Sequence, residues 1–270
     1  MRRAARLAVR FLAFSLLKIG RRVERIGRGL AVASFTRDET FDLSVAEWEA
    51  FGDDNPLEQW FAWEADILAR HVRPGDSILV VGAGSGRDVL PFLAAGYDVT
   101  ALDITPRALD TLKERARTRG FTLTTVHASI VDAELAPRAF DVALFSWFSF
   151  SYLQGRAGRR AALSRSEAAL RPGGRIILSY PVRVGGRAVA PPASLIVRAA
   201  ARLLGGLLAE TGDEAIVSGT AARPAVFFTH PFAPSEIEDE VKETGFSIVF
   251  HERPNPDVGV MVLQRRSEAA

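Results

Sequence analysis

The stretch that most constrains this chain runs from Ile78 to Asp103 and reads ILVVGAGSGRDVLPFLAAGYDVTALD. A short apolar run from Ile78 to Val81 leads into glycines at positions 82, 84 and 86. A helical pattern follows, and a second, mostly apolar run ends on Asp103. This alternation predicts a strand, a glycine-rich turn, a helix and a second strand.

The spacing of the glycines indicates what the turn binds. A dinucleotide-binding fingerprint, G-x-G-x-x-G, requires its third glycine at position 87, where Arg87 stands. The pattern here is G-x-G-x-G, which lets the backbone approach a ligand lying across the carboxyl ends of the strands. Asp103, at the end of the next strand, can accept hydrogen bonds from both hydroxyls of a ribose.

This pattern resembles the first two motifs of the class I S-adenosylmethionine-dependent methyltransferases. The resemblance covers residues from about Leu57 to Gln264. It implies a Rossmann-like, doubly wound α/β fold with a seven-stranded, mostly parallel sheet, an antiparallel last strand and helices before the first strand. It also implies that S-adenosylmethionine is the cofactor. The residues that it assigns to the glycine loop and the ribose are Gly82, Ala83, Gly84, Gly86, Asp103 and Ile104.

The third strand, FTLTTVH, follows a helix for which Thr105 is the predicted cap. In the family, the loop after this strand usually offers an acid to the adenine amino group. Here Ser129 stands at that place and Ile130 follows it. Asp132 is an alternative, although it could equally cap a local turn.

A fourth strand, FDVALFSW, ends beside the methionine part of the cofactor in the family, which places Phe145 and Ser146 there. Transfer of a methyl group from a sulfonium needs mainly alignment, with a base only for a nucleophile of high pKa. Candidate catalytic residues are Tyr152, Tyr180 and His230, each with a purely structural role as the alternative.

The composition excludes several classes of site. Cysteine is absent, so disulfides and thiolate nucleophiles play no part. The four histidines are too far apart in sequence to form a local metal motif, and we expect no metal. The net charge is +2, and no basic stripe with interleaved aromatic residues indicates a nucleic-acid partner.

Residues 1–40 are predicted to be a separate, basic amphipathic segment. The first 29 residues hold nine basic side chains and one acid, Glu24, which gives +8 and leaves −6 for the rest of the chain. Apolar residues recur every three or four positions, at Val9, Leu12, Leu16, Ile19, Val23, Ile26 and Leu30. The pattern is too short and too charged to span a membrane. It predicts a cytoplasmic protein whose residues 1–30 either dock on protein or lie on an anionic membrane surface.

Phe41 to Val72 is predicted to form two helices. Asp42 or Ser44 could cap the first, and Asp53 and Asp54 precede the second. One face of the second helix would bury Leu57, Trp60, Phe61, Ile67 and Leu68. Glu64 lies in the middle of that face, where it is either paired within the core or, together with Trp63, directed at a substrate.

Residues 41–270 form the predicted methyltransferase domain, which a segment at 182–225 interrupts. This segment contains an apolar helical face with Ile196, Ala200, Leu203 and Leu207. It is interpreted either as a lid over the substrate or as an insertion that packs on the sheet. A helix and a two-strand hairpin then close the fold, with the connection at residues 254–257.

Together these features predict a methyltransferase that acts on a small, apolar or lipid-like acceptor. The alternative is a non-catalytic protein that binds the cofactor and acts in regulation or assembly through its basic N-terminal helix.

Overall fold

A computed structural model describes residues 35–51, 59–183, 212–220 and 223–266, together with the single positions 20, 26, 30, 195, 199, 203 and 210. The chain divides into two compact units. One comprises Val45–Gly186 with Thr229–Ala270 and holds a seven-stranded sheet. The other comprises Met1–Ser44 with Arg187–Phe228 and holds a two-stranded sheet. The predicted boundary at residue 40 stays a prediction.

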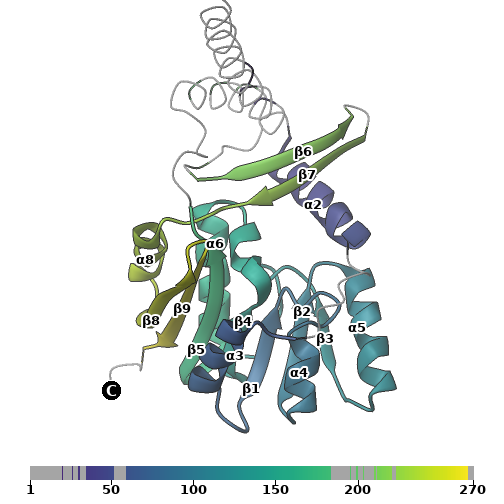
Figure 1. The fold of residues 1–270 in the computed structure, drawn as a ribbon, viewed down its shortest axis with the longest axis vertical. Helices are drawn as coiled ribbons and strands as arrows, with labels where there is room; N and C mark the ends of the chain where they lie inside the picture. Colours follow the sequence, from purple (N-terminus) through teal and green to yellow (C-terminus); the bar gives the residue numbers. More distant parts are fainter. Residues whose placement is uncertain are drawn as a thin grey trace, which may run out of the picture. The chain divides into compact units, whose positions relative to one another are not determined.

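The large sheet has the strand order β3-β2-β1-β4-β5-β9-β8 (Figure 1). Strand β9 runs antiparallel to β5 and β8, whereas the pairs among β1 to β5 are parallel. The predicted Rossmann-like sheet with an antiparallel last strand is confirmed. The strands are β1 (Ser77–Val81), β2 (Asp98–Asp103), β3 (Thr124–His127), β4 (Phe140–Phe145), β5 (Leu170–Pro181), β8 (Phe246–Asn255) and β9 (Val258–Arg265).

Strand order reverses between β1 and β4, and this reversal positions the site. The chain adds β2 and β3 on one side of β1 and then returns to place β4 and β5 on the other. Val81, the last residue of β1, is in register with Leu102 of β2 and Phe145 of β4. The residues that follow these three strands therefore meet at one edge, where open α/β sheets bind their ligands.

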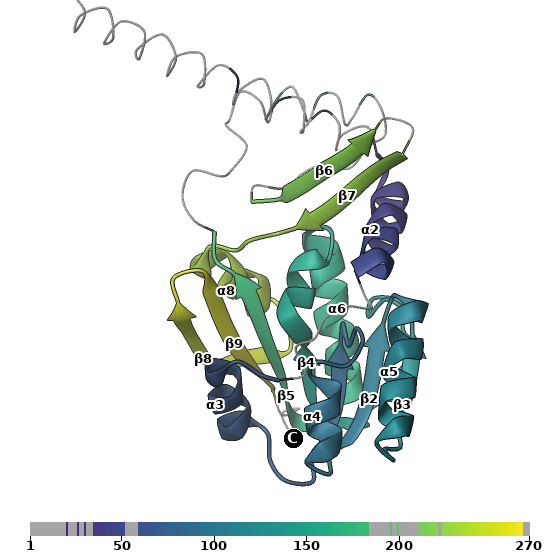
Figure 2. The same cartoon turned by 45° about the vertical axis from the view of Figure 1, so that its right-hand side comes forward.

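Both faces of the sheet are buried, which explains the continuous apolar run in β1. Ile78 and Val80 contribute to one apolar core, and Leu79 and Val81 to the other. Figure 2 shows the helices on the two faces. The first core packs against α3 (Ala62–His71), α4 (Val89–Ala94) and α5 (Pro106–Thr118), and the second against α6 (Gly155–Ala169) and α8 (Pro234–Lys242).

Helix α2 (Arg37–Phe51) begins earlier than predicted, because a capping box formed by Thr36 and Glu39 fixes its N-terminus. The hydroxyl of Thr36 accepts a hydrogen bond from the Glu39 backbone N–H at 3.2 Å, and the Glu39 carboxylate accepts one from the Thr36 N–H at 2.8 Å. The predicted cap at Asp42 or Ser44 is wrong. Ser44 lies inside the helix and donates to the carbonyl of Thr40.

Helix α3 begins at Ala62, so Trp60 and Phe61 precede it and do not belong to its buried face. The Glu64 carboxylate accepts a hydrogen bond from the Phe61 backbone N–H at 2.8 Å, which fixes this start. Ile67 and Leu68 are buried as predicted. The predicted contributions of Asp53, Asp54 and Leu57 lie outside the described residues.

Within the segment at 182–225, the structure describes a hairpin of β6 (Glu214–Thr220) and β7 (Arg223–Thr229). Most of the predicted apolar helix lies outside the described residues, as does most of the N-terminal helix. In the part of the chain that is described, no helix has the length and hydropathy to cross a membrane. At the closing hairpin, β8 extends through Asn255 and leaves a two-residue connection, shorter than predicted.

Candidate active site

The glycine loop after β1 lies against the end of β2. The backbone N–H groups of Gly82 and Ala83 both donate to the carbonyl of Leu102, at 2.9 and 3.1 Å. One residue later, the Gly84 N–H donates to the carboxylate of Asp103 at 2.7 Å. The loop and the acid predicted to hold the cofactor are therefore in direct contact.

The three glycines of this loop are needed for different reasons. All have positive φ values, +74° at Gly82, +51° at Gly84 and +110° at Gly86. A Cβ at Gly82 would come within 2.6 Å of Ser149, and one at Gly86 within 2.6 Å of Leu112. A Cβ at Gly84 would meet nothing within 4 Å. Gly82 and Gly86 thus serve internal packing, and Gly84 alone of the three borders open space.

Asp103 is 7% exposed, and its carboxylate is held from two sides. Besides the Gly84 N–H, it accepts hydrogen bonds from the Thr105 N–H at 2.8 Å and the Thr105 hydroxyl at 2.5 Å. Thr105 is the residue before α5, but its side chain makes no cap hydrogen bond and binds Asp103 instead. A carboxylate has about four acceptor positions, so one remains here for a ligand.

Strand β3 brings the residues predicted to contact adenine to the same edge. The Nε2 atom of His127 lies 3.1 Å from the carbonyl oxygen of Ile104, which ties the end of β3 to the residue after β2. Ser129 is half-buried, and its backbone carbonyl accepts a hydrogen bond from the backbone N–H of Asp132. Ile130 is fully buried. The contact of these residues with a cofactor stays a prediction.

Strand β4 ends at Phe145, two residues before the predicted end, because the chain turns into a short helical segment. This segment is η1 (Ser146–Tyr152), and it contains two left-handed residues, Trp147 with φ 38° and Phe148 with φ 65°. Such conformations are unfavourable for bulky side chains, by about 1 to 3 kcal/mol each, and cluster at functional sites. The turn places Ser149 against the glycine loop, where its hydroxyl donates to the carbonyl of Val81 at 2.9 Å.

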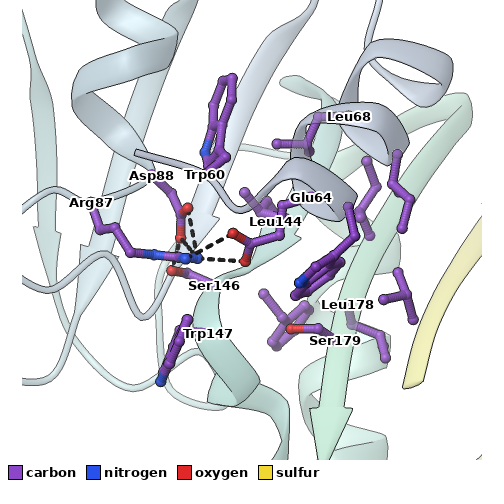
Figure 3. Close-up of a pocket in the computed structure, with 15 residues that line it drawn as sticks. Trp60, Glu64, Leu68, Arg87, Asp88, Leu144, Ser146, Trp147, Leu178 and Ser179 are labelled. Atoms are coloured by element: carbon purple, nitrogen blue, oxygen red, sulfur yellow. Dashed lines mark hydrogen bonds and ion pairs between the residues drawn. The ribbon is translucent and has the colours of Figure 1, made fainter. Parts of the chain in front are cut away.

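A buried cluster of charged groups lies beside this turn (Figure 3). The guanidinium of Arg87 donates to both carboxylate oxygens of Glu64, at 2.9 and 2.8 Å, and to Asp88 at 3.0 Å. Asp88 also accepts a hydrogen bond from the Ser146 hydroxyl. The Arg87 guanidinium carbon lies 4.7 Å from the ring centre of Trp147. We name these four hydrogen-bonded residues, Glu64, Arg87, Asp88 and Ser146, the Arg87 cluster.

The Arg87 cluster is almost wholly removed from water. Exposed fractions are 8% for Glu64, 8% for Arg87, 1% for Asp88 and 6% for Ser146. Burial by itself lowers the pKa of Arg87, but the hydrogen bonds that it donates to Glu64 and the charges of Asp88 and Glu64 raise it above its ordinary value. Arg87 is therefore a permanent cation that faces two carboxylates.

The cluster forms one wall of a cavity of about 330 Å³, counted with its open mouth. The carboxyl ends of β4 and β5 supply Leu144, Phe145, Ile177, Leu178 and Ser179 to the lining. Aromatic and apolar side chains complete it, contributed mainly by the chain before β1 and by η1: Trp60, Trp63, Ile67, Leu68, Trp147 and Val260. A lining that is mostly apolar with a few polar groups is typical of small-molecule sites.

The three predicted catalytic residues do not line this cavity. Tyr180 is fully buried, and its hydroxyl lies 2.5 Å from Nε2 of His251, whose Nδ1 lies 2.9 Å from Glu238. Burial, with the nearby charge of Glu238, raises the pKa of Tyr180 to about 12. Tyr152 packs its ring 5.0 Å from that of Trp48, and burial raises its pKa to about 12.

His230 is fully buried and lies on the chain segment just after β7. Its Nε2 atom is 3.3 Å from Glu236, and its backbone N–H donates to Ser151 at 2.8 Å. Burial would raise the pKa of Glu236, but the hydrogen bond from His230, the Ala233 N–H and the charge of Arg183 together lower it. A catalytic role for His230, Tyr180 or Tyr152 stays a prediction.

The Arg87 cluster was not predicted as a unit from the sequence. Arg87 stands out there only as the residue in place of a third glycine, and a paired Glu64 is one of two alternatives, with no partner named. The available signal was the dipeptide Arg87-Asp88 directly after the glycine loop, together with an acid on a predicted apolar helix face. Their meeting depends on a contact across 23 positions of sequence, which no local pattern encodes.

Known proteins resemble this chain in sequence and in structure. Residues 78–174 match the family model described as a methyltransferase domain. A solved S-adenosylmethionine-dependent methyltransferase from Methanosarcina mazei superposes with a TM-score of 0.59 at 19% identity, covering 78% of this chain and all of that one. Residues 78–174 therefore form a methyltransferase domain, and the chain has the fold of the S-adenosylmethionine-dependent methyltransferases. The matched residues begin in β1 and end in β5, so they include the glycine loop, Asp103 and most of the Arg87 cluster.

Two further proteins resemble this methyltransferase. A demethylmenaquinone methyltransferase from Symbiobacterium thermophilum is 24% identical over 214 residues, which are 77% of this chain and 83% of the relative. The 1,6-didemethyltoxoflavin-N1-methyltransferase of Burkholderia thailandensis, solved with 1,6-didemethyltoxoflavin and S-adenosylhomocysteine, has a TM-score of 0.55 at 21% identity. That match covers 84% of this chain and 86% of the other and shows a shared fold.

Proposed function

We propose that this methyltransferase transfers the methyl group of S-adenosylmethionine to a small molecule with a sizeable apolar part. The observation that carries the proposal is the position of the cavity. It opens at the carboxyl ends of β4 and β5, beside the glycine loop, and most of its lining is aromatic or aliphatic. Cofactor and acceptor could therefore meet at one edge of the sheet.

The residues present fit the cofactor. Gly84 borders open space where a side chain would stand, and Asp103 keeps one acceptor position at the end of β2. Ser129 and Ile130 would contact the adenine, and Phe145 and Ser146 the methionine part. When bound, S-adenosylmethionine supplies a methyl group on a good leaving group, so the protein has mainly to orient the acceptor and exclude water.

The apolar lining favours an apolar acceptor. Trp60, Trp63, Trp147, Ile177 and Leu178 would bury acceptor surface at roughly 25 cal/mol per Å². Two resembling proteins support an aromatic acceptor, since one is named for demethylmenaquinone and the other was solved with 1,6-didemethyltoxoflavin. A lid formed by the segment at 182–225 would add to this burial. Leu203, on its predicted apolar face, is 87% exposed, and its neighbour Leu207 lies outside the described residues.

Methyl transfer from labelled S-adenosylmethionine to a fractionated metabolite extract tests the proposal. We expect the labelled product to partition into organic solvent and its mass to exceed that of the acceptor by one methylene group. Changing Leu203 and Leu207 to Ser should raise the KM for the acceptor and leave cofactor affinity intact, because the proposed lid would contact the acceptor and not the cofactor. A labelled product that is a polar metabolite, a protein or a nucleic acid would refute the apolar acceptor.

We also propose that the protein is cytoplasmic and that residues 1–30 attach it to anionic membranes. The charge of +8 over the first 29 residues supports attraction to acidic lipid, and the apolar stripe supports insertion. Co-sedimentation with liposomes should require anionic lipid, fall with added salt and disappear when residues 1–30 are removed. If the truncated protein instead loses cooperative unfolding and neither form binds lipid, the segment docks on protein.

A further inference from the structure

The Arg87 cluster contains more negative than positive charge. Two carboxylates, Glu64 and Asp88, face one guanidinium, and Arg87 is the one cation among the described residues that line the cavity. With both acids ionised the cluster carries −1. A net charge held out of water is costly unless a partner of opposite sign completes it.

A second observation points to a bound ligand. Arg87 is more than nine-tenths buried, and among the described residues no acceptor lies within hydrogen-bond distance of its Nε–H. A buried donor without a partner costs about 1 to 3 kcal/mol. The cluster therefore lacks one hydrogen-bond acceptor and one positive charge, and a ligand that carries both would complete it.

An amino acid group next to a sulfonium has this combination. The methionine part of S-adenosylmethionine carries one carboxylate, one ammonium and one sulfonium. Added to Glu64, Asp88 and Arg87, it gives three negative and three positive charges. S-adenosylhomocysteine lacks the sulfonium charge and leaves one negative charge without a partner.

We propose that the Arg87 cluster distinguishes the cofactor from its demethylated product by charge. This inference rests on the proposed function. The Arg87 Nε–H would donate to the carboxylate that both molecules share, and the excess charge of Glu64 and Asp88 favours the one that carries the sulfonium. Loss of that positive charge on methyl transfer weakens binding, which promotes product release.

The position of the cluster supports this assignment. Arg87 and Asp88 follow the glycine loop directly, and Ser146 follows β4 at the switch in strand order. Ser149 of the same turn packs against Gly82 and Val81, so the turn that holds Asp88 through Ser146 also borders the loop. Trp147, stacked on Arg87 and 39% exposed, forms part of the mouth of the cavity.

Calorimetry on the full-length protein tests the proposal through the ratio of two dissociation constants, for S-adenosylmethionine and S-adenosylhomocysteine. In Asp88→Asn we expect the affinity for S-adenosylmethionine to fall about tenfold relative to that for S-adenosylhomocysteine, because one buried charge near the sulfonium is removed. Glu64→Gln should shift the ratio in the same direction. Arg87→Gln should shift it in the opposite direction, since it raises the excess charge. Sinefungin, which carries an ammonium near the sulfonium position, should follow S-adenosylmethionine.

Asp141→Asn is the matched control, because Asp141 lies at the other end of β4 and loses the same charge outside the cluster. Its ratio should equal that of the wild type. An unchanged ratio in Asp88→Asn and Glu64→Gln, with both ligands still bound, would overturn the inference and leave the proposed function intact. If the wild-type protein binds neither ligand, the proposed function itself is wrong, and the inference fails with it.

Discussion

Two arginines are buried with carboxylate partners in the unit that holds the large sheet, and their surroundings differ. Arg159 on α6 donates to both oxygens of Glu240 on α8, at 2.6 to 3.0 Å, and the two side chains are 1% and 2% exposed. Its guanidinium also lies 5.2 Å from the ring centre of Phe232. This pair has one cation and one anion, and it joins two helices on one face of the sheet.

Arg87 has two carboxylate partners and a cavity beside it, and no described residue accepts a hydrogen bond from its Nε–H. Both arginines are permanently charged and both are out of water, so burial alone does not distinguish a structural pair from a binding site. The two are distinguished by whether the charges and hydrogen bonds of the arginine are balanced within the chain. A balanced pair such as Arg159–Glu240 is complete within the chain, whereas the Arg87 cluster is completed by a ligand.

The largest expected effect lies at the balanced pair. Glu240→Ala leaves the Arg159 guanidinium buried without its partner and should lower the free energy of unfolding by about 3 to 5 kcal/mol. Denaturant unfolding followed by circular dichroism measures this loss. In the fraction that remains folded, the ratio of the dissociation constants for cofactor and product should not change. A change in that ratio would remove the distinction between the two arginines.

Asp103→Ala should weaken binding of S-adenosylmethionine by about 1 to 3 kcal/mol through loss of the one charge-assisted hydrogen bond that its remaining acceptor position can make to the ribose. S-adenosylhomocysteine has the same ribose, so its affinity should fall equally. This contrasts with the unequal effect expected at Asp88. Asp98→Ala, at the exposed start of β2, is the control for calorimetry and should leave both affinities unchanged. Full affinity in Asp103→Ala would contradict the assignment of the ribose site.

Tyr180 provides a buried group that is neutral at ordinary pH. Its pKa is raised to about 12 by burial, above its value in the unfolded chain, so the fold favours the protonated form. The resulting contribution to the free energy of unfolding is fully present below pH 10. About 2 kcal/mol of it is lost as the pH rises from 10 to 12. Tyr180→Phe should flatten this decline in the free energy of unfolding. An identical alkaline decline in both proteins would show that Tyr180 ionises as it does in water.

The smallest expected effect is the stability of Asp88→Asn. Glu64 still binds Arg87 through both carboxylate oxygens, and the variant removes the excess charge. The free energy of unfolding should therefore change by less than about 1 kcal/mol. Thermal unfolding alongside Glu240→Ala provides the direct comparison. A loss as large as that at Glu240 would mean that Asp88 serves the fold and not a ligand.

Much of the fold could be predicted from local patterns. Runs of apolar residues, glycines and prolines mark the strands of the large sheet and the turns between them, and the resemblance supplied the strand order, whereas strand β6 within the segment at 182–225 was not predicted. Element boundaries were less accurate where tertiary contacts decide them. Helix α3 begins at Ala62 because Glu64 caps it, and β4 ends at Phe145 because the left-handed turn at Trp147 begins there.

The sequence by itself determined the residues that carry the family resemblance, namely the glycine loop and Asp103, because their function depends on backbone conformation and on position within one strand-turn-helix-strand unit. Only the tertiary structure decided that Gly84 borders open space while Gly82 and Gly86 pack internally. It also brought Glu64 and Ser146 to Arg87 and Asp88 from distant parts of the chain. Charge balance in a buried cluster is a property of groups that meet in space, and spacing along the chain does not encode it.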